Sequence, residues 1–470
     1  MANVNVTIDG KALSVPAGTT ILEAARSNGI HIPTLCFLKE LEPHASCRMC
    51  VVEVEGARTF QHACAAKVRD GMVVHTNTEA VYASRKLTLQ LLLSNHAVDC
   101  HHCLRIGSSK CDDLDPRFCE MCFFCDCVKD GFCDLQALAR EYKVDVLPFE
   151  QKHNTRPVDA TTVIVRNPNK CIKCKRCVDV CGKVQTVHNL AASGRGCEVT
   201  IGPAFGKPMA ESGCIGCGRC VEVCPTGAIF AREHKDELVY YAHRDGVKTA
   251  AMISADLLPE LERVLKLDAG SVSLGEIAGA LKKIGVDAVF DAAEAEAAAQ
   301  AQAEALLEEK LAGGKSVILT DSFAAKAFLE EVFPDKKDSF LFYDSSLAVF
   351  GKAGENFDKR FAFGAVGGDA AECEKTACVD LAVNPRELAR IMIRTGAEPN
   401  PGRTADFESL DLPKASGKYA KLLDKAAWNM DREPEVFELD GLKCAVCHNL
   451  GQARRLLQGT EAFHVIRVIA

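Results

Sequence analysis

The chain has 470 residues, a formal net charge of −8 and 48% hydrophobic residues, which is ordinary for a protein of several globular domains. The acidic balance argues against nucleic-acid binding, and no run of about 18 apolar residues predicts a membrane span. The N-terminal stretch lacks the basic and apolar regions of a signal peptide, so we expect a cytoplasmic protein.

Cysteine is the unusual component of this composition. The chain has 25 cysteines, of which 21 precede residue 225. In a cytoplasmic chain this density indicates metal sites rather than disulfides. Because thiolates and exposed clusters oxidise readily, the cysteine content also favours an anaerobe. We therefore expect a multidomain α+β protein whose N-terminal half binds metal.

Residues 1–79 predict a small β-rich domain around a cysteine loop. The alternating stretch 3–8 ends in an Asp–Gly hairpin signal, and 21–26 predicts an amphipathic helix. Further strands are expected over 51–56 and 73–76. This order suits a β-grasp ferredoxin with a [2Fe–2S] cluster, although the cysteine intervals are longer than in plant-type ferredoxins. The candidate ligands are Cys36, Cys47, Cys50 and Cys64.

The segment 47–56, which reads CRMCVVEVEG, closely resembles the N-terminal module of two families. One is the iron-only ([FeFe]) hydrogenases, and the other is the large iron–sulfur subunit of respiratory NADH dehydrogenase (complex I). The resemblance implies that residues 80–148 form a second cluster domain, which opens with a helix over 82–95. It also implies a [4Fe–4S] cluster with one histidine and three cysteine ligands, starting at His96, Cys100 and Cys103.

The third cysteine of this site is displaced along the chain. The families close the site with Cys-x-Leu-Gln shortly after Cys103, whereas this chain reaches CDLQ only at 133–136. Cys133 is therefore our preferred closing ligand, with Cys111 as the second choice. We interpret the intervening stretch as an insertion that holds an additional iron–sulfur cluster, with zinc or free thiols as alternatives. Its cysteines are Cys111, Cys119, Cys122, Cys125 and Cys127.

Residues 149–235 contain two runs of C-x2-C-x2-C-x3-C, the second followed directly by Pro225. Bacterial two-cluster ferredoxins have this spacing, and in them the fourth cysteine of each run ligates the other run's cluster. Zinc is less suited, because its sites usually use pairs of C-x2-C. Cys197 lies outside the spacing and is expected to be a buried thiol. The first [4Fe–4S] cluster is expected on Cys171, Cys174, Cys177 and Cys224. The second is expected on Cys181, Cys214, Cys217 and Cys220.

Residues 236–470 are poor in cysteine and predict an α/β domain with helices over 274–283 and 292–311. Strands are expected over 248–253, 288–290, 316–320, 340–343 and 381–383.

Three stretches of this domain, 279–291, 383–390 and 441–457, resemble motifs of the catalytic domain of iron-only hydrogenases. Those enzymes carry a Thr-Ser-Cys-Cys-Pro motif that supplies a cluster ligand and a proton-transfer thiol. Here 320–324 reads Thr-Asp-Ser-Phe-Ala, and the last family motif would fall beyond Ala470. Since thiolates are the soft ligands that such iron requires, we expect a hydrogenase-like domain without the hydrogen-activating cluster.

Four cysteines of this domain remain without a role. They are interpreted as buried thiols, with a residual cluster as the alternative. The CAVCH stretch at 444–448 also matches a c-type haem attachment pattern, which is not expected without an export signal. No P-loop, nucleophile elbow or dinucleotide fingerprint is present. The four cysteines are Cys373, Cys378, Cys444 and Cys447.

Together these patterns predict an electron-transfer subunit with no substrate site of its own. The resemblance implies a flavin-based electron-bifurcating complex that links NADH to ferredoxin, with NADPH or formate as the second substrate. It implies as partners a flavin-bearing NADH-binding subunit and a small thioredoxin-like [2Fe–2S] subunit. The alternatives are a functional hydrogenase with displaced ligands, a stand-alone electron carrier and an assembly factor that stores clusters.

Overall fold

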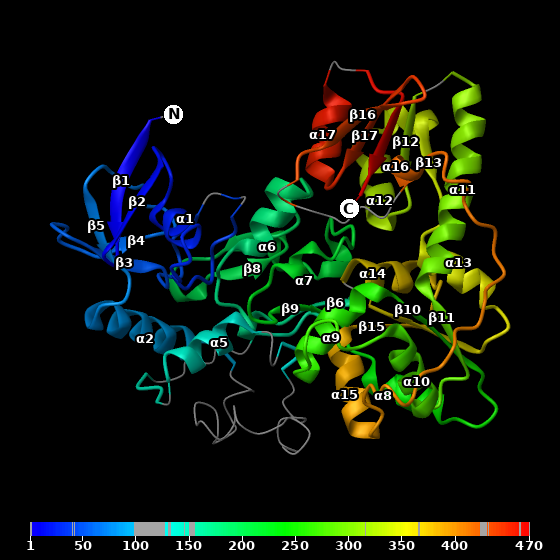
Figure 1. The fold of residues 1–470 in the computed structure, drawn as a ribbon, viewed down its shortest axis with the longest axis horizontal. Helices are drawn as coiled ribbons and strands as arrows, with labels where there is room; N and C mark the ends of the chain where they lie inside the picture. Colours follow the sequence, from blue (N-terminus) through cyan, green and yellow to red (C-terminus); the bar gives the residue numbers. More distant parts are fainter. Residues whose placement is uncertain are drawn as a thin grey trace.

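The computed structural model places the cysteine-rich half of the chain beside two sheets, one parallel and one mostly parallel (Figure 1). Within the described residues, no helix is both long enough and apolar enough to span a membrane. The structure describes residues 2–39, 41, 43–97, 127–129, 133–144, 146–149, 156–314, 316–364, 367–423, 430, 432–459 and 462–469.

The N-terminal domain is a five-stranded mixed sheet in the order β2-β1-β5-β3-β4, with one short helix, α1 (Ile21–Arg26). Val6 and Ile8 of β1 are buried, as the alternating pattern predicts. A capping box between Thr20 and Glu23 fixes the start of α1. The strands are β1 (Asn3–Ile8), β2 (Lys11–Pro16), β3 (Val51–Val54), β4 (Gln61–His62) and β5 (Met72–His75).

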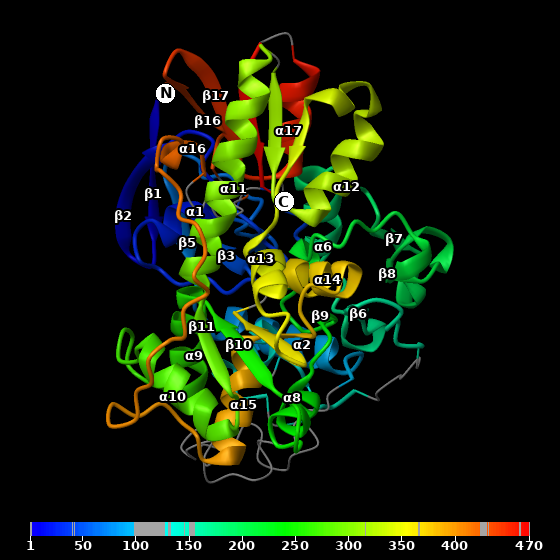
Figure 2. The same cartoon turned by 90° about the vertical axis from the view of Figure 1, so that its right-hand side faces the viewer.

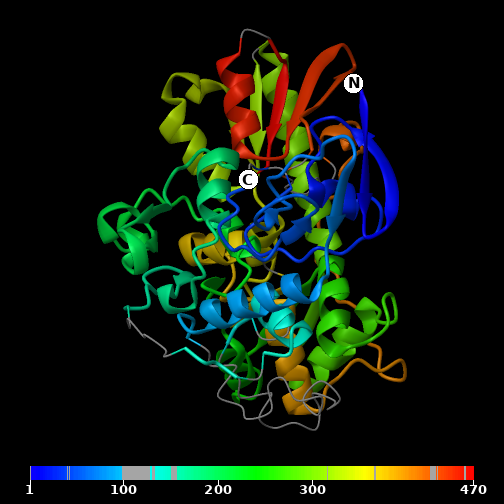
Figure 3. The ribbon, with the colours of Figure 1, turned by 90° about the vertical axis from the view of Figure 1, so that its left-hand side faces the viewer.

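Two helices, α2 (Glu79–Leu93) and α5 (Asp134–Glu141), connect this sheet to the next part of the chain. Figure 3 is viewed from the side of the N-terminal domain and shows α2 crossing beneath the sheet. Arg85 of α2 is buried and donates to the Val51 carbonyl (2.7 Å) and to the Tyr142 hydroxyl (3.0 Å). The helices and the cysteine loop of the first domain therefore form one packed unit.

The central segment has little regular structure and is built around two short helices, α6 (Arg176–Asp179) and α7 (Arg219–Glu222). A π-helical turn, η4, extends α6 over Val180–Val184. Two small antiparallel ladders complete the segment. Their strands are β6 (Ile164–Arg166) with β9 (Ile229–Ala231), and β7 (Ala191–Ser193) with β8 (Thr200–Gly202).

The C-terminal region contains two separate sheets. The first is parallel, in the order β11-β10-β14-β15, and the second is mostly parallel, in the order β13-β12-β18-β17-β16. The first sheet comprises β10 (Thr249–Ile253), β11 (Ala288–Asp291), β14 (Lys359–Phe363) and β15 (Leu381–Val383). The second comprises β12 (Val317–Thr320), β13 (Phe340–Phe342), β16 (Glu435–Leu439), β17 (Leu442–Cys447) and β18 (Val465–Val468).

Helices cover both sheets, and α11 (Ala292–Ala312) runs from the first sheet to the second (Figure 2). The helices α13 (Ser346–Ala353) and α14 (Gly367–Thr376) lie between the two sheets (Figure 2). The other helices are α8 (Lys235–Ala242), α9 (Leu258–Leu265), α10 (Leu274–Ile284), α12 (Phe323–Val332), α15 (Pro385–Thr395), α16 (Ala420–Leu423) and α17 (Leu450–Gln458).

Candidate metal centres

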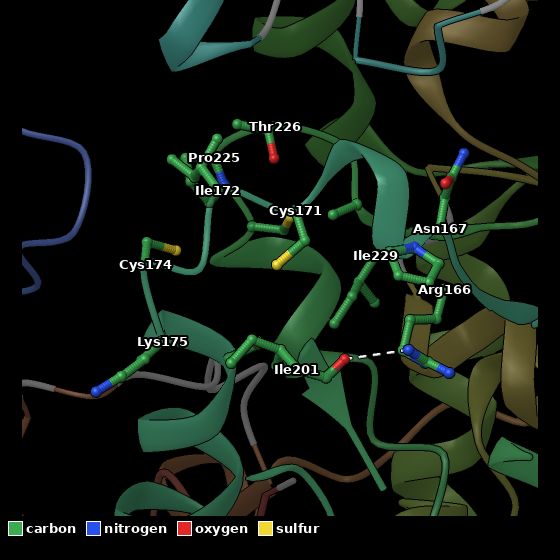
Figure 4. Close-up of a pocket in the computed structure, with 14 residues that line it drawn as sticks. Arg166, Asn167, Cys171, Ile172, Cys174, Lys175, Ile201, Pro225, Thr226 and Ile229 are labelled. Atoms are coloured by element: carbon green, nitrogen blue, oxygen red, sulfur yellow. Dashed lines mark hydrogen bonds between the residues drawn. The ribbon is translucent and has the colours of Figure 1, made fainter. Parts of the chain in front are cut away.

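Two cavities in the central segment are each lined by four cysteines drawn from both runs. Figure 4 shows the sulfur atoms of Cys171 and Cys174 turned toward the first cavity. The space free of protein atoms at the two cavities, open solvent at their mouths included, is about 410 and 360 Å³, so they are similar in size. The first is lined by Cys171, Cys174, Cys177 and Cys224. The second is lined by Cys181, Cys214, Cys217 and Cys220.

The loops that carry these cysteines repeat the same backbone conformation. In the first run, Lys173 and Lys175 have φ of 58° and 66°, and in the second Gly216 and Gly218 have φ of 75° and 73°. Left-handed residues at these positions turn the chain sharply between consecutive cysteines. Three sulfur atoms of one short loop can therefore face one cavity. The sequence signal for this turn is visible only in the second run, where glycines occupy both positions.

Backbone N–H groups point at sulfur atoms that line both cavities. The N–H of Lys173 donates to Cys171 Sγ (3.4 Å), and the N–H of Asn189 donates to Cys181 Sγ (3.3 Å). Burial raises the pKa of the Cys171 and Cys214 thiols to about 11, because a buried thiolate lacks solvation. Thiolates at these positions therefore need a cationic partner, and soft iron is such a partner. The donor sets fit [4Fe–4S] clusters.

No three His, Cys, Asp or Glu side chains of the described residues are grouped to hold a single metal ion. In a [4Fe–4S] cube, by contrast, each thiolate binds a different iron atom, so the four sulfur atoms do not converge on one point.

The four cysteines of the N-terminal loop are all buried, and they meet in two pairs. Cys50 Sγ donates to Cys64 Sγ at 3.3 Å. A hydrogen bond from Cys47 lowers the pKa of Cys36 to about 5. Each pair thus places two sulfur atoms side by side, which suits two ligands on one iron. A [2Fe–2S] cluster contains two irons, so the donor set fits that cluster.

The site expected at His96 and the expected insertion lie only partly within the described residues. His96 is buried, and its neighbour Ala97 donates its N–H to the Asn169 carbonyl (2.8 Å). Cys133 begins α5 as its N-cap, and burial raises the pKa of its thiol to about 12. Cys127 is buried close enough to Cys133 for their charges to interact. Outside the described residues lie Cys100, Cys103, Cys111, Cys119, Cys122 and Cys125, and the side chain of Cys197 is not described.

The candidate sites are packed against one another. One buried cluster of side chains contains cysteines of the N-terminal loop, of α5 and of the first cavity. The Asp134 N–H donates to the Pro225 carbonyl (2.9 Å), directly after Cys224. His44, in the N-terminal cysteine loop, bonds to Asp179 of α6. These contacts between distant segments could not be inferred from sequence spacing. The shared cysteines are Cys36, Cys47, Cys133 and Cys174.

The hydrogenase-like region uses its motif positions for structure. Ser322 caps α12 by accepting the Ala325 N–H (3.2 Å). Cys444 and Cys447 are buried in two different hydrophobic clusters, so these thiols do not meet. Cys373 and Cys378 instead pack in one buried cluster, and a hydrogen bond from Cys373 lowers the pKa of Cys378 to about 6. The four remaining cysteines therefore do not gather at one place.

Comparisons with family models give two matches. A model described as "2Fe-2S iron-sulfur cluster binding domain" matches residues 1–79. A second, described as "4Fe-4S binding domain", matches residues 210–230. The prediction that the chain carries both kinds of iron–sulfur domain is confirmed by these matches.

Several curated proteins are similar to this chain. The NADP-reducing hydrogenase subunit HndD of Solidesulfovibrio fructosivorans is 32% identical, over 100% of this chain and 87% of that protein. The mitochondrial NADH-ubiquinone oxidoreductase 78 kDa subunit of Candida albicans is 32% identical, over 43% of this chain and 25% of that protein. The NADPH-Fe(3+) oxidoreductase subunit alpha of Geobacter sulfurreducens is 34% identical, over 44% of this chain and 22% of that protein.

Two solved structures resemble parts of this chain. An NAD+-reducing [NiFe]-hydrogenase is 28% identical with a TM-score of 0.41, over 48% of this chain and 86% of that one. An [FeFe]-hydrogenase is 13% identical with a TM-score of 0.38, over 51% of this chain and 82% of that one.

Proposed function

Because this chain belongs to the family of the NADP-reducing hydrogenase subunit HndD, we propose that it is the iron–sulfur subunit of a multi-subunit NAD(P)H-linked oxidoreductase. Its role in that complex is to relay single electrons, and it has no substrate site of its own. Its partners are a flavin-bearing NADH-binding subunit, a small thioredoxin-like [2Fe–2S] subunit and ferredoxin.

The observation that carries this proposal is the unbroken packing of cysteine-lined sites. The N-terminal cysteine loop shares a buried cluster with Cys133 and Cys174. Cys177, Cys220 and Cys224 then lie together in the next buried cluster, which connects the two cavities. Cluster storage does not require that different sites pack next to one another, whereas electron relay requires neighbouring sites.

Bound iron–sulfur clusters supply one-electron transfer at these sites. Cys36, Cys47, Cys50 and Cys64 would hold a [2Fe–2S] cluster, and the two cavities would hold [4Fe–4S] clusters on their four cysteines each. Burial of the thiols excludes water, and N–H groups directed at sulfur stabilise the thiolate form. These contacts also influence the reduction potential of each site.

Two further centres belong to the proposal. His96, Cys100, Cys103 and Cys133 would hold a third [4Fe–4S] cluster, in which the neutral imidazole removes one negative charge. The insertion, from Cys111 to Cys127, would hold an additional iron–sulfur cluster. Iron and zinc analysis of the purified protein distinguishes that cluster from a zinc site.

The C-terminal region is proposed to serve as a scaffold or docking surface, without hydrogenase activity. Ser322 and Phe323 stand where iron-only hydrogenases carry thiols, and the Ser322 hydroxyl is used as a helix cap. The complex would then couple NADH and ferredoxin to a reaction other than hydrogen evolution, by flavin-based electron bifurcation. NADPH oxidation and formate oxidation are the two candidates for that reaction.

Anaerobic purification of the native complex, with mass spectrometry of all co-eluting chains, tests this proposal. A flavin-bearing NADH-binding subunit in the complex, with NADH reducing the clusters, would support it. An NADPH-binding or formate-oxidising companion would identify the second reaction. Elution of a fully metallated chain on its own, or hydrogen evolution by the matured protein, would overturn it.

A further inference from the structure

Cys373 and Cys378 form a thiol pair outside the proposed cluster sites. Cys373 lies in α14 and is buried, and Cys378 follows the helix and is half-buried. The two side chains pack in the same buried cluster. Cys444 and Cys447, in the same half of the chain, are buried separately and provide internal controls.

The backbone holds the two thiols together. Ala377 lies between them with φ of 52°, a left-handed conformation that is unfavourable for alanine. Its N–H donates to the Cys373 carbonyl (2.9 Å), which turns the chain back toward the helix. Gly351 of α13 lies so close that a Cβ there would come within 2.0 Å of the Cys378 carbonyl oxygen. The packing of α13 therefore leaves the turn little freedom.

The surroundings of Cys378 favour its thiolate. The hydrogen bond from Cys373, with help from Thr376 and the Val379 N–H, lowers the pKa of Cys378 to about 6 despite burial. A thiolate is the reactive form in thiol–disulfide chemistry, and a second thiol in contact with it can complete a disulfide. The pair thus has both a nucleophile and a resolving partner.

The pair is attached to the second cluster cavity through α14. A Cβ at Gly216, between Cys214 and Cys217, would come within 3.0 Å of the Ala371 Cβ. Ala371 and Cys373 of α14 also share a buried cluster with Cys220, which lines the second cavity. Figure 1 shows α14 next to α7, the helix that carries Cys220. The dithiol therefore lies one helix away from the loop of the second cavity.

We propose that Cys373 and Cys378 are a redox-active dithiol that exchanges electrons with an iron–sulfur centre held in the second cavity. The inference rests on the proposed function for that electron acceptor. Oxidation breaks two S–H bonds and forms one S–S bond, releasing two protons to solvent. The two electrons leave one at a time, so the iron–sulfur acceptor is used twice. Such a pair connects one-electron transfer by an iron–sulfur centre with the two-electron conversion of a dithiol to a disulfide.

The disulfide has a direct mass-spectrometric signature. Trypsin cleaves after Lys375, between the two cysteines, so a disulfide appears as linked peptides 361–375 and 376–386. The native complex is equilibrated anaerobically in mixtures of reduced and oxidised dithiothreitol, then alkylated and digested. We expect the linked pair to form and vanish reversibly with the buffer ratio, while Cys444 and Cys447 stay unlinked. Cys373→Ser and Cys378→Ser each abolish the linked pair.

Metal content separates this proposal from the alternatives. Iron and zinc should be unchanged in Cys373→Ser and Cys378→Ser, and a loss of either metal would show that the pair is a metal site instead. Absence of the linked peptides at full iron content overturns the dithiol and leaves the relay intact. Linked peptides in a chain that binds no iron support the dithiol couple but overturn both the relay and the exchange with a cluster.

Coupling to the cavity is tested with reduced methyl viologen, a one-electron reductant. The oxidised pair in the parent complex should be reduced at least tenfold faster than in Cys217→Ser or Cys214→Ser, which lack a proposed ligand. Dithiothreitol should reduce all three proteins equally, which shows that the pair itself is intact. Equal rates with methyl viologen in parent and variants would overturn the coupling.

Discussion

Single residues determine the shape of the cluster loops. The two runs form the same left-handed turns, the first with lysines and the second with glycines. Gly216→Ala places a Cβ in the left-handed region, 3.0 Å from the Ala371 Cβ, so we expect a loss of about 1–2 kcal/mol in loop stability. The measurement is iron content and thermal midpoint, and about four irons should become labile. Lys173→Gly, at the equivalent position of the first run, is the matched control and should retain iron. Equal behaviour of the two variants would contradict this interpretation of the turn.

Asp159 is the best residue for a pH test, because it holds the Met209 segment that lines the second cavity. Burial alone would raise its pKa, but hydrogen bonds from Thr161 and the Met209 N–H, with the Arg166 charge, lower it. A carboxyl with a lowered folded-state pKa stabilises the fold above its unfolded pKa of about 3.9, and that stability disappears as the pH falls through the folded value.

Asp159→Asn should therefore be less stable than the parent by about 1–3 kcal/mol at pH 7. The difference in thermal midpoint should stay constant down to about pH 5 and shrink below about pH 4. Thr161→Val removes one of the hydroxyl contacts and should show a smaller difference. A difference that persists unchanged at pH 3 would show that charge is not its cause.

The four cysteines that line each cavity are the sets expected from the spacing, and their role as cluster ligands stays a prediction. Other residue-scale features were not predictable from spacing. Lys173 and Lys175 carry no glycine signal for their left-handed turns. The contact between Cys373 and Cys378 depends on the turn at Ala377 and on the packing of α13, both of which are tertiary features.

At the scale of elements, α2 secures the N-terminal cysteine loop through one buried side chain. Arg85→Met removes hydrogen bonds to the Val51 carbonyl and the Tyr142 hydroxyl, although it also relieves the burial of a charge. We expect a net loss of about 2–3 kcal/mol, measured as a lower thermal midpoint. Lys86→Met, one residue along the same helix, should change stability by less than about 0.5 kcal/mol. Similar losses in both variants would contradict a specific role for Arg85.

The elements with continuous apolar patterns were predicted well, and the irregular ones were not. Expected strands over 248–253, 288–290 and 316–320 correspond to β10, β11 and β12. β14 was missed because it begins with Lys359 and Arg360, which interrupt the apolar pattern. The division into two sheets was also missed, because pairing between strands depends on contacts that a single sequence does not display.

At the scale of the whole molecule, the packing order of the sites predicts an order of electron transfer. The N-terminal cysteine loop shares a buried cluster with Cys133 and Cys174, and Cys177 and Cys220 of the two cavities share the next one. Cys174→Ser should interrupt the relay in the middle. With the flavin-bearing partner and NADH, the signal of the reduced [2Fe–2S] cluster should persist in electron paramagnetic resonance, while ferredoxin reduction falls at least tenfold.

Cys197→Ser is the matched control for this experiment, because Cys197 lies outside the ligand spacing. It should keep full iron content and full ferredoxin reduction, whereas Cys174→Ser should lose about four irons. If electrons from the flavin instead enter at the second cavity, Cys174→Ser would lose the [2Fe–2S] signal. Persistence or loss of the [2Fe–2S] signal in Cys174→Ser therefore assigns the direction of electron transfer between these sites.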